Sequence, residues 1–440
     1  MLLEFKIKND KSFKDECILS LTPAPKQKDL EYSILSEEIG KKTYKGLCSA
    51  VIYGPNASGK TNIIGAMETL KKIILRGNIR NVDDNTSSNV ASNALELIPN
   101  NMLASVEPVN FSITFTAKNM LFDYDLSLDL GRFLETENKR KVLKETLSVN
   151  NDLVFTRSNE VKIGNLEVID SYLVPAYKQN AEGAAALATG SLHEEELFLL
   201  NGFKTMFSSK LVSIITSWFE NEFEIIYSSN YKKLIKKFPD SKKNSVLVDK
   251  TLNKAATLFG VNSNALGYVL SGNSEEAQLC SIFNEKNKSK AIPVELFESY
   301  GTIRFVNLFP IVLKTLMQGG ILVVDEFDAS IHPMALMNLI TIFHNDEVNI
   351  HNAQLVFNTH NPIFLNPNLF RRDEIKFVDR DETNHCSTHY SLSDFGTAGK
   401  SGVRKTDDYM KNYFVDNYGA IKSIDLAPII QNLIQNKDKE

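Results

Sequence analysis

Cysteine is scarce in this sequence, and its few copies lie far apart. The 440 residues contain 4 cysteines, Cys17, Cys48, Cys280 and Cys386, and no two of them form a CxxC pair. Their spacing gives no sign of a disulfide framework or of a zinc site. We therefore interpret all of them as reduced structural cysteines and expect a cytoplasmic protein.

Long hydrophobic runs and an excess of one charge are also missing. No apolar run approaches the roughly 20 residues that a membrane span needs, and the charged residues between Met1 and Asp10 do not fit a signal peptide. The 49 Lys and Arg residues nearly balance the 54 Asp and Glu residues, for a net charge of −5. This balance is typical of globular proteins. We expect no membrane contact, and any nucleic-acid contact must be local.

Hydrophobic periodicity divides the chain into sheet and helix segments. The length of 440 residues predicts two or three lobes. Alternation over residues 3–8 predicts a half-buried edge strand, and the apolar run 50–53 predicts a parallel strand covered on both faces, followed by a helix over 61–75. Most of 170–290 has a helical pattern. Further strands are predicted at 110–115, 121–126, 153–155, 321–324, 355–357 and 374–378.

A phosphate-binding loop is the most specific motif in the chain. Residues 54–61 match G-x-x-x-x-G-K-[ST], in which glycines let backbone N–H groups surround phosphates. Lys60 would bind the β and γ oxygens, and Thr61 would bind Mg²⁺. The alternative, a glycine turn that only caps a helix, is disfavoured by the buried strand before it. The predicted ATP-binding residues here are Gly54, Pro55, Asn56, Ala57, Ser58, Gly59, Lys60, Thr61 and Asn62.

Two adjacent carboxylates follow the predicted strand 321–324. Open α/β sheets bind ligands at the carboxyl ends of their strands, so we expect Asp325 to hold Mg²⁺ and Glu326 to act as the general base for water. An apolar strand that ends in Asp-Glu is common by chance, and the pair could also cap the next helix. Together with the phosphate loop, however, it predicts a nucleotide hydrolase.

A further motif predicts that the nucleotide lies between two subunits. Ser299, Gly301 and Thr302 precede the helical stretch 303–317, in which Pro310 predicts a kink. A helix N-terminus of this kind binds anions. Because this one has no phosphate of its own, we expect it to bind the γ-phosphate held by a second subunit. A plain serine N-cap is the alternative.

A histidine ends the next buried strand. His360 follows the run 355–357, and a neutral imidazole there can sense the γ-phosphate. By itself such a histidine is more often structural, but the neighbouring motifs favour the functional interpretation. The segment 329–333 would cross the dimer interface.

These residues resemble the ABC-type AAA ATPases of bacterial abortive-infection and anti-phage systems, which are similar to OLD proteins and to the heads of SMC and recombination ATPases. By this resemblance, Ser299 and Gly301 are the signature that acts in trans, Glu326 is the base and His360 is the switch. His332 stands where transporter cassettes carry Asp, and no glutamine fits the loop that completes Mg²⁺ coordination. The resemblance covers Ser12–Asp15, Tyr53–Asn62, Glu298–Thr302, Asp325–Pro333, Thr359–Asn361, Arg371–Ile375, Leu392–Phe395 and Tyr418–Ala420.

The resemblance implies an α/β fold, an ABC-type P-loop ATPase head with a parallel core sheet, an antiparallel β subdomain and an inserted helical lobe. Residues 1–165 would form the first part of the head, 166–290 the lobe, and 291–440 the second part of the head with a C-terminal extension. It also implies ATP and Mg²⁺ as ligands and a homodimer or higher even-numbered oligomer. The resemblance further implies that the ATPase controls an effector protein, either a toxin or a nuclease of the TOPRIM, RloB-like or HNH class. Because the chain ends soon after Ala420, we expect this effector to act in trans. We also expect a phage product to trigger the system.

Two other functions are weighed against this one. A DNA-repair or chromosome ATPase needs long coiled-coil arms, and no segment sustains three heptads. A transporter subunit is disfavoured by the long insert between Lys60 and Asp325. A lysine cluster within Lys232–Lys243 could bind nucleic acid or form a solvated helix face. Its members are Lys232, Lys233, Lys236, Lys237, Lys242 and Lys243.

Overall fold

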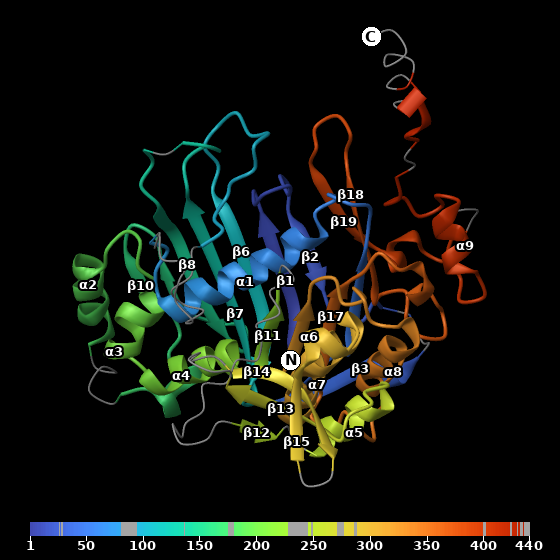
Figure 1. Ribbon diagram of the computed structural model, residues 1–440. Coiled ribbons are helices and arrows are strands. Elements are labelled where there is room, and N and C mark those ends of the chain that lie inside the picture. The colour runs from blue at the N-terminus through green and yellow to red at the C-terminus, as the bar shows by residue number, and fades with distance from the viewer. Residues whose placement is uncertain are drawn as a thin grey trace.

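The fold is described from a computed structural model (Figure 1). None of the helices in its described part is long and apolar enough to span a membrane. The lysine cluster lies outside the described residues. These are 1–25, 27, 30–80, 95–135, 137–174, 180–227, 245–247, 250–270, 277–285, 288–398, 402–422, 425–428, 430, 431 and 434.

The centre of the molecule is a six-stranded sheet in the order β11-β16-β17-β5-β18-β19. It is parallel from β11 to β18, and only the β18–β19 pair is antiparallel. Strands β5, β16 and β17 are buried throughout, as expected for strands covered on both faces. The predicted strands at 50–53, 321–324, 355–357 and 374–378 are confirmed. The bounds are β5 Ser49–Tyr53, β11 Phe223–Ile226, β16 Ile321–Val324, β17 Gln354–Asn358, β18 Ile375–Arg380 and β19 Ser387–Ser391.

A second, seven-stranded sheet is antiparallel throughout, in the order β10-β9-β8-β7-β6-β1-β2. The predicted strands at 110–115, 121–126 and 153–155 belong to it. The prediction that the first strand is an edge strand is wrong, because β1 lies between β6 and β2; alternation reveals a buried face but not the number of neighbours. The bounds are β1 Leu2–Lys8, β2 Cys17–Ser20, β6 Val109–Ala117, β7 Met120–Asp129, β8 Lys141–Val149, β9 Asp152–Arg157 and β10 Val161–Ile163.

Helix α1 (Lys60–Arg76) packs between the two sheets and crosses the strands of the larger one (Figure 1). Its apolar side chains share one core with Phe5 of β1 and Val356 of β17. Each such side chain contributes roughly 1.5–3 kcal/mol on burial. The helix ends at Gly77, whose φ of +76° is a left-handed conformation that glycine adopts without strain. The helix predicted over 61–75 is thus confirmed. Its fully buried residues are Ile63, Ile64, Met67, Leu70, Ile73 and Ile74.

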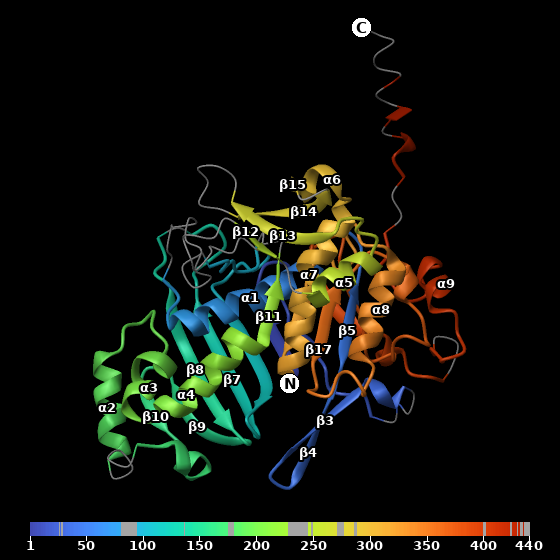
Figure 2. The ribbon, with the colours of Figure 1, turned by 60° about the horizontal axis from the view of Figure 1, so that its bottom comes forward.

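The helical lobe predicted over 166–290 is found mainly in its first part, and α5 (Lys250–Leu258) is the one described helix of the second part. The first part packs beside β9 and β10, as Figure 2 shows, and ends where β11 joins the central sheet. Its elements are η3 Glu167–Tyr172, α2 Ala181–Ser191, η5 Leu199–Phe203, α3 Lys204–Met206, α4 Ser209–Ser217 and η6 Trp218–Glu222.

The second part of 166–290 forms an antiparallel sheet, β12-β13-β14-β15, so the prediction of a helical lobe is wrong there. Tyr268 and Leu279 of this sheet are buried against Val306 of α7, a distant helix. The partner that buries this sheet is distant in sequence, so local periodicity does not reveal it. The elements are β12 Ser245–Leu247, α5 Lys250–Leu258, β13 Ala265–Leu270, β14 Ala277–Glu285 and β15 Lys288–Pro293.

The remaining elements surround the central sheet. Helix α7 runs through Pro310 without ending, and a two-stranded sheet, β3-β4, projects from the base (Figure 2). Helices α7 and α8 share a core with β5, β16 and β17. The bounds are η1 Glu31–Ser33, β3 Ile34–Ile39, β4 Lys42–Leu47, α6 Val294–Phe297, α7 Tyr300–Gln318, α8 Pro333–Phe343, η7 Pro362–Phe364, η8 Leu392–Phe395 and α9 Tyr409–Phe414.

Candidate functional site

The phosphate loop connects β5 to α1 at the carboxyl edge of the central sheet. Gly59 has a φ of +112°, which disfavours every residue with a side chain. A Cβ there would also lie 2.7 Å from the hydroxyls of Ser12 and Ser387. At Gly54 a Cβ would lie 2.2 Å from the carbonyl oxygen of Val378. Both glycines are therefore required by this loop conformation.

Lys60 lies inside the loop. Its Nζ donates hydrogen bonds to the carbonyl oxygens of Gly54 at 2.8 Å and of Pro55 at 2.9 Å. Burial lowers the pKa of Lys60 to about 8, against the opposing effect of the Asp325 and Glu326 carboxylates. The ammonium therefore keeps its proton at neutral pH, and anionic phosphates can replace the two carbonyl acceptors.

The structure brings the two predicted Mg²⁺ ligands together. Thr61 Oγ1 donates to Asp325 Oδ1 at 3.0 Å, and Asp325 is 3% exposed. Asn358, at the end of β17, donates through Nδ2 to the same oxygen at 2.6 Å. A hydroxyl and a carboxylate oxygen in contact fit Mg²⁺, which prefers oxygen ligands. When bound, Mg²⁺ neutralises charge on the β- and γ-phosphates.

Glu326 has an exposed side chain and a constrained backbone. Its φ is +50°, a left-handed conformation that is unusual for a glutamate. The backbone N–H of Glu326 donates to Asn358 Oδ1, and the Glu326 carbonyl accepts a hydrogen bond from Arg304 Nη2. These two contacts, from β17 and α7, hold the turn after β16. The carboxylate of Glu326 is thus held outside the sheet, beside the buried Asp325.

Asn358 bonds both the Asp325 carboxylate and the backbone N–H of Glu326, and the sequence analysis did not identify it. Its only sequence signal is a polar residue at the end of the apolar run 355–357. Replacing Asn358 with alanine leaves the Glu326 N–H without its acceptor and removes a donor to a charged carboxylate. We expect the free energy of unfolding to fall by about 3 kcal/mol, and turnover to fall because Asp325 and Glu326 lose their alignment.

Chemical denaturation and an ATPase assay would measure these two effects. Asn338→Ala is the matched control, because Asn338 is exposed on α8 and its side-chain amide donates to the Met334 carbonyl of the same helix. Equal stability and turnover in the two variants would contradict the assigned role of Asn358.

His360 lies at the same edge of the sheet, directly after Thr359, whose N–H bonds the Ile52 carbonyl. Burial lowers the pKa of His360, and the nearby Lys60 lowers it further, against the opposing effect of the site carboxylates. The imidazole is therefore neutral at pH 7, as a hydrogen-bonding sensor of phosphate requires. His332 has a separate role, since its Nδ1 accepts from the Met334 N–H at 3.3 Å and caps α8, as an aspartate would.

The predicted trans signature does not join this group of residues. Ser299 is exposed and caps α7, with its Oγ accepting from the Thr302 N–H at 3.1 Å. A Cβ on Gly301 would lie 2.1 Å from the carbonyl oxygen of Ser330, so glycine is needed for packing within the chain. Within the described residues, no hydrogen bond links Ser299, Gly301 or Thr302 to the phosphate loop.

Other side chains hold the phosphate loop from outside. Asn62 donates through Nδ2 to Ser12 Oγ at 2.7 Å, so it ties α1 to the turn after β1. Ser387 Oγ donates to the Ser58 carbonyl, and Arg380 Nη1 donates to the Ala57 carbonyl at 3.0 Å. The residues Arg380 and Ser387, from the β18–β19 hairpin, carry no motif that sequence reasoning could have recognised.

Comparison with known families identifies one that matches most of this chain. The profile of the family described as "AAA domain, putative AbiEii toxin, Type IV TA system" matches residues 49–366, well over half of the chain. No curated protein matches this chain. The matched range contains the phosphate loop, Asp325, Glu326 and His360. It implies a nucleotide-hydrolysing domain and confirms the resemblance to ATPases of abortive-infection systems; the closer likeness to OLD proteins and SMC heads stays a prediction.

Proposed function

Because the chain belongs to this family of AAA-domain proteins, we propose that it is an ATP-hydrolysing switch of a toxin–antitoxin or anti-phage defence system. Two copies with an ABC-type arrangement close over ATP and Mg²⁺. The carrying observation is the hydrogen-bonded chain Thr61–Asp325–Asn358–Glu326, which joins the start of α1 to the ends of β16 and β17 at one sheet edge. It places the candidate Mg²⁺ ligands beside the candidate base.

The position of the α7 N-terminus supports the proposal of a dimer. Ser299 is the exposed N-cap of a helix of 19 residues, and no hydrogen bond among the described residues links it to the phosphate loop of the same chain. The positive end of such a helix stabilises an anion. In an isologous dimer, the commonest symmetric assembly, each Ser299 would contact the γ-phosphate bound by the other copy.

Ser299→Asp tests this arrangement. Aspartate caps a helix as well as serine does, but its charge would repel the partner's γ-phosphate. We expect near-normal ATP binding, no ATP-dependent dimer in analytical ultracentrifugation, and hydrolysis lower by roughly 10²-fold, since opposed like charges cost several kcal/mol.

Ser299→Asn is the neutral control and should keep most activity. Mixing Ser299→Asp with Lys60→Ala should restore some hydrolysis, because one of the two composite sites is then intact. Equal turnover of Ser299→Asp and Ser299→Asn would contradict the dimer. Gly301 is unsuitable for this test, because any side chain there meets Ser330 of its own chain.

The second candidate, a DNA-repair or chromosome ATPase, needs coiled-coil arms. Among the described helices the longest is α7, with 19 residues, and this favours the defence role. We propose that an effector in trans, a nuclease or toxin, is controlled by closure of the dimer and that a phage product triggers it. Genes beside this one distinguish the candidates, since they encode either a toxin or nuclease, or repair proteins.

A further inference from the structure

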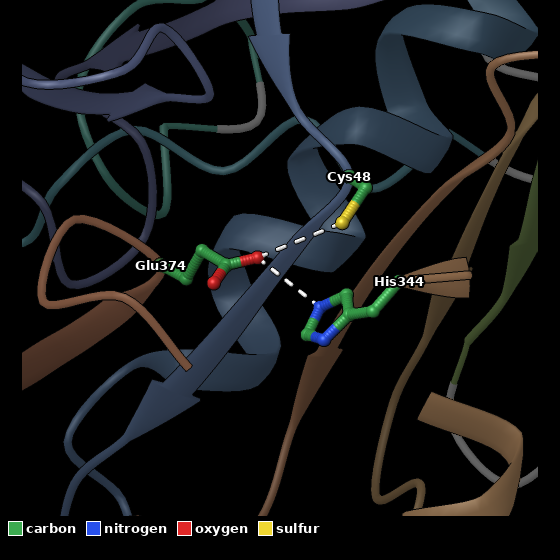
Figure 3. Close-up of side chains that lie close together, drawn as sticks. All are labelled: Cys48, His344 and Glu374. Atoms are coloured by element: carbon green, nitrogen blue, oxygen red, sulfur yellow. Dashed lines mark hydrogen bonds and ion pairs between the residues drawn. The ribbon is translucent and has the colours of Figure 1, made fainter. Parts of the chain in front are cut away.

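Three side chains of metal-binding type meet at the edge of the central sheet opposite to the phosphate loop. Cys48 directly precedes β5, Glu374 directly precedes β18, and His344 caps the C-terminal end of α8. The phosphate loop follows the other end of β5, so the two groups are separated by the length of the strand. Figure 3 shows the three side chains pointing toward one another.

The distances between their donor atoms suit one metal ion. Cys48 Sγ lies 3.8 Å from Glu374 Oε1, and His344 Nε2 lies 3.3 Å from the same oxygen. All three donor atoms are within 4.8 Å of one another. Around tetrahedral Zn²⁺, with bonds of about 2.0 Å to N or O and about 2.3 Å to S, neighbouring donors are about 3.3–3.6 Å apart. Small side-chain shifts would therefore accommodate the ion.

Contacts behind the three donors fix their orientation. Glu374 Oε2 accepts from the Arg371 N–H at 2.8 Å, which leaves Oε1 toward the other two groups. The His344 ring lies between Tyr32 and Phe370, with centroid distances of 6.0 and 5.7 Å. Such outer contacts are typical of metal sites, where they orient the ligands.

Ser49 supplies one more oxygen. Its Oγ lies 2.7 Å from Glu374 Oε1 and 2.9 Å from His344 Nε2. These are hydrogen-bond separations, and they would lengthen to about 3.3 Å if the hydroxyl became the fourth donor of a tetrahedral ion.

Charge also favours a cation at this place. Glu374 is fully buried beside His344, and its Oε1 lies 3.3 Å from the His344 Nε2. A divalent ion bound to a thiolate, a carboxylate and a neutral imidazole would give a buried site without net charge, and metal binding drives the thiol to lose its proton. Sulfur and nitrogen donors select zinc over magnesium or calcium.

We propose that Cys48, His344 and Glu374 bind one Zn²⁺ ion, with Ser49 Oγ as the fourth donor. The ion ties the starts of β5 and β18 to the end of α8. Tyr32, whose ring centroid lies 6.0 Å from that of His344, is 46% exposed, so the site lies one ring away from the surface. The alternative is a purely hydrogen-bonded cluster with the same donors.

Metal content tests the proposal. The full chain is purified without a metal-affinity tag and dialysed against Zn²⁺. It is then dialysed against zinc-free buffer that contains Mg²⁺, which competes with Zn²⁺ for Thr61 and Asp325. We expect elemental mass spectrometry to find about one zinc per unsubstituted chain, and little zinc in Cys48→Ser and His344→Gln. Cys386→Ser is the control, since Cys386 is another buried cysteine far from this group, and it should keep its zinc.

A spectrum of the unsubstituted chain covers the case in which these variants do not fold. Loaded with Co²⁺ instead of Zn²⁺, the chain should show the near-ultraviolet charge-transfer band of a cobalt–thiolate bond. Three outcomes would each overturn the proposal. The unsubstituted chain could hold no more zinc than the buffer, Cys48→Ser could hold as much zinc as the unsubstituted chain, or the cobalt spectrum could lack the thiolate band. These readouts do not depend on ATP hydrolysis, so they are independent of the proposed function.

Discussion

Replacing Lys60 with alanine is expected to abolish ATP binding at micromolar nucleotide. The ammonium is buried within the phosphate loop and keeps its charge at neutral pH. Its loss removes charge-assisted hydrogen bonds to two phosphates, each worth about 1.5–3 kcal/mol. We therefore expect the dissociation constant for ATP to rise by roughly 10²-fold or more. Isothermal titration calorimetry would measure it.

The control for this variant is Lys72→Ala. Lys72 lies on the same helix and pairs at 3.5 Å with Glu68, one turn away, rather than with the loop. It should bind ATP normally. Thermal unfolding of both variants separates a binding defect from a folding defect. Near-normal ATP affinity in folded Lys60→Ala would remove the phosphate-loop assignment.

Replacing Glu326 with glutamine is expected to stop hydrolysis while ATP remains bound. Glutamine has nearly the same shape, so the backbone contacts to Asn358 and Arg304 and the Mg²⁺ ligands remain. The attacking water loses its base, and general-base catalysis contributes about 10²–10⁴-fold. Turnover should fall by this factor with little change in ATP affinity.

If two copies close over ATP, the same variant should accumulate as an ATP-dependent dimer, seen by light scattering coupled to size-exclusion chromatography. Glu347→Gln is the matched control, because Glu347 is an exposed glutamate after α8. Unchanged turnover in Glu326→Gln would show that another group activates the water.

The meeting of these residues at one sheet edge could be predicted because each motif is local. The loop at 54–61 and the carboxylates after 321–324 are short motifs attached to continuous apolar strands, and strands of that kind are confirmed at β5 and β16. Parallel strands place such motifs at the same edge. The hydrogen bond of Thr61 with Asp325 is the direct consequence.

Packing within the chain limits what a motif can reveal. The glycine at 301 was interpreted as part of an anion site, and the structure adds a second requirement, the close approach of the Ser330 carbonyl. Likewise, the alternating pattern of the first strand correctly indicated a buried face but not its two neighbours. A residue's own sequence surroundings do not contain the identity of its contacts.

By itself, the sequence determined the phosphate loop, the acidic strand end and the buried strands that carry them, because hydrophobic period and motif spacing act over a few residues. Only the tertiary structure decided that Asn358 bonds Asp325, that 245–293 includes a sheet packed on α7, and that Cys48 meets Glu374. Those contacts join segments far apart in the chain, and they depend on the path by which the sheets and helices bury their apolar faces together.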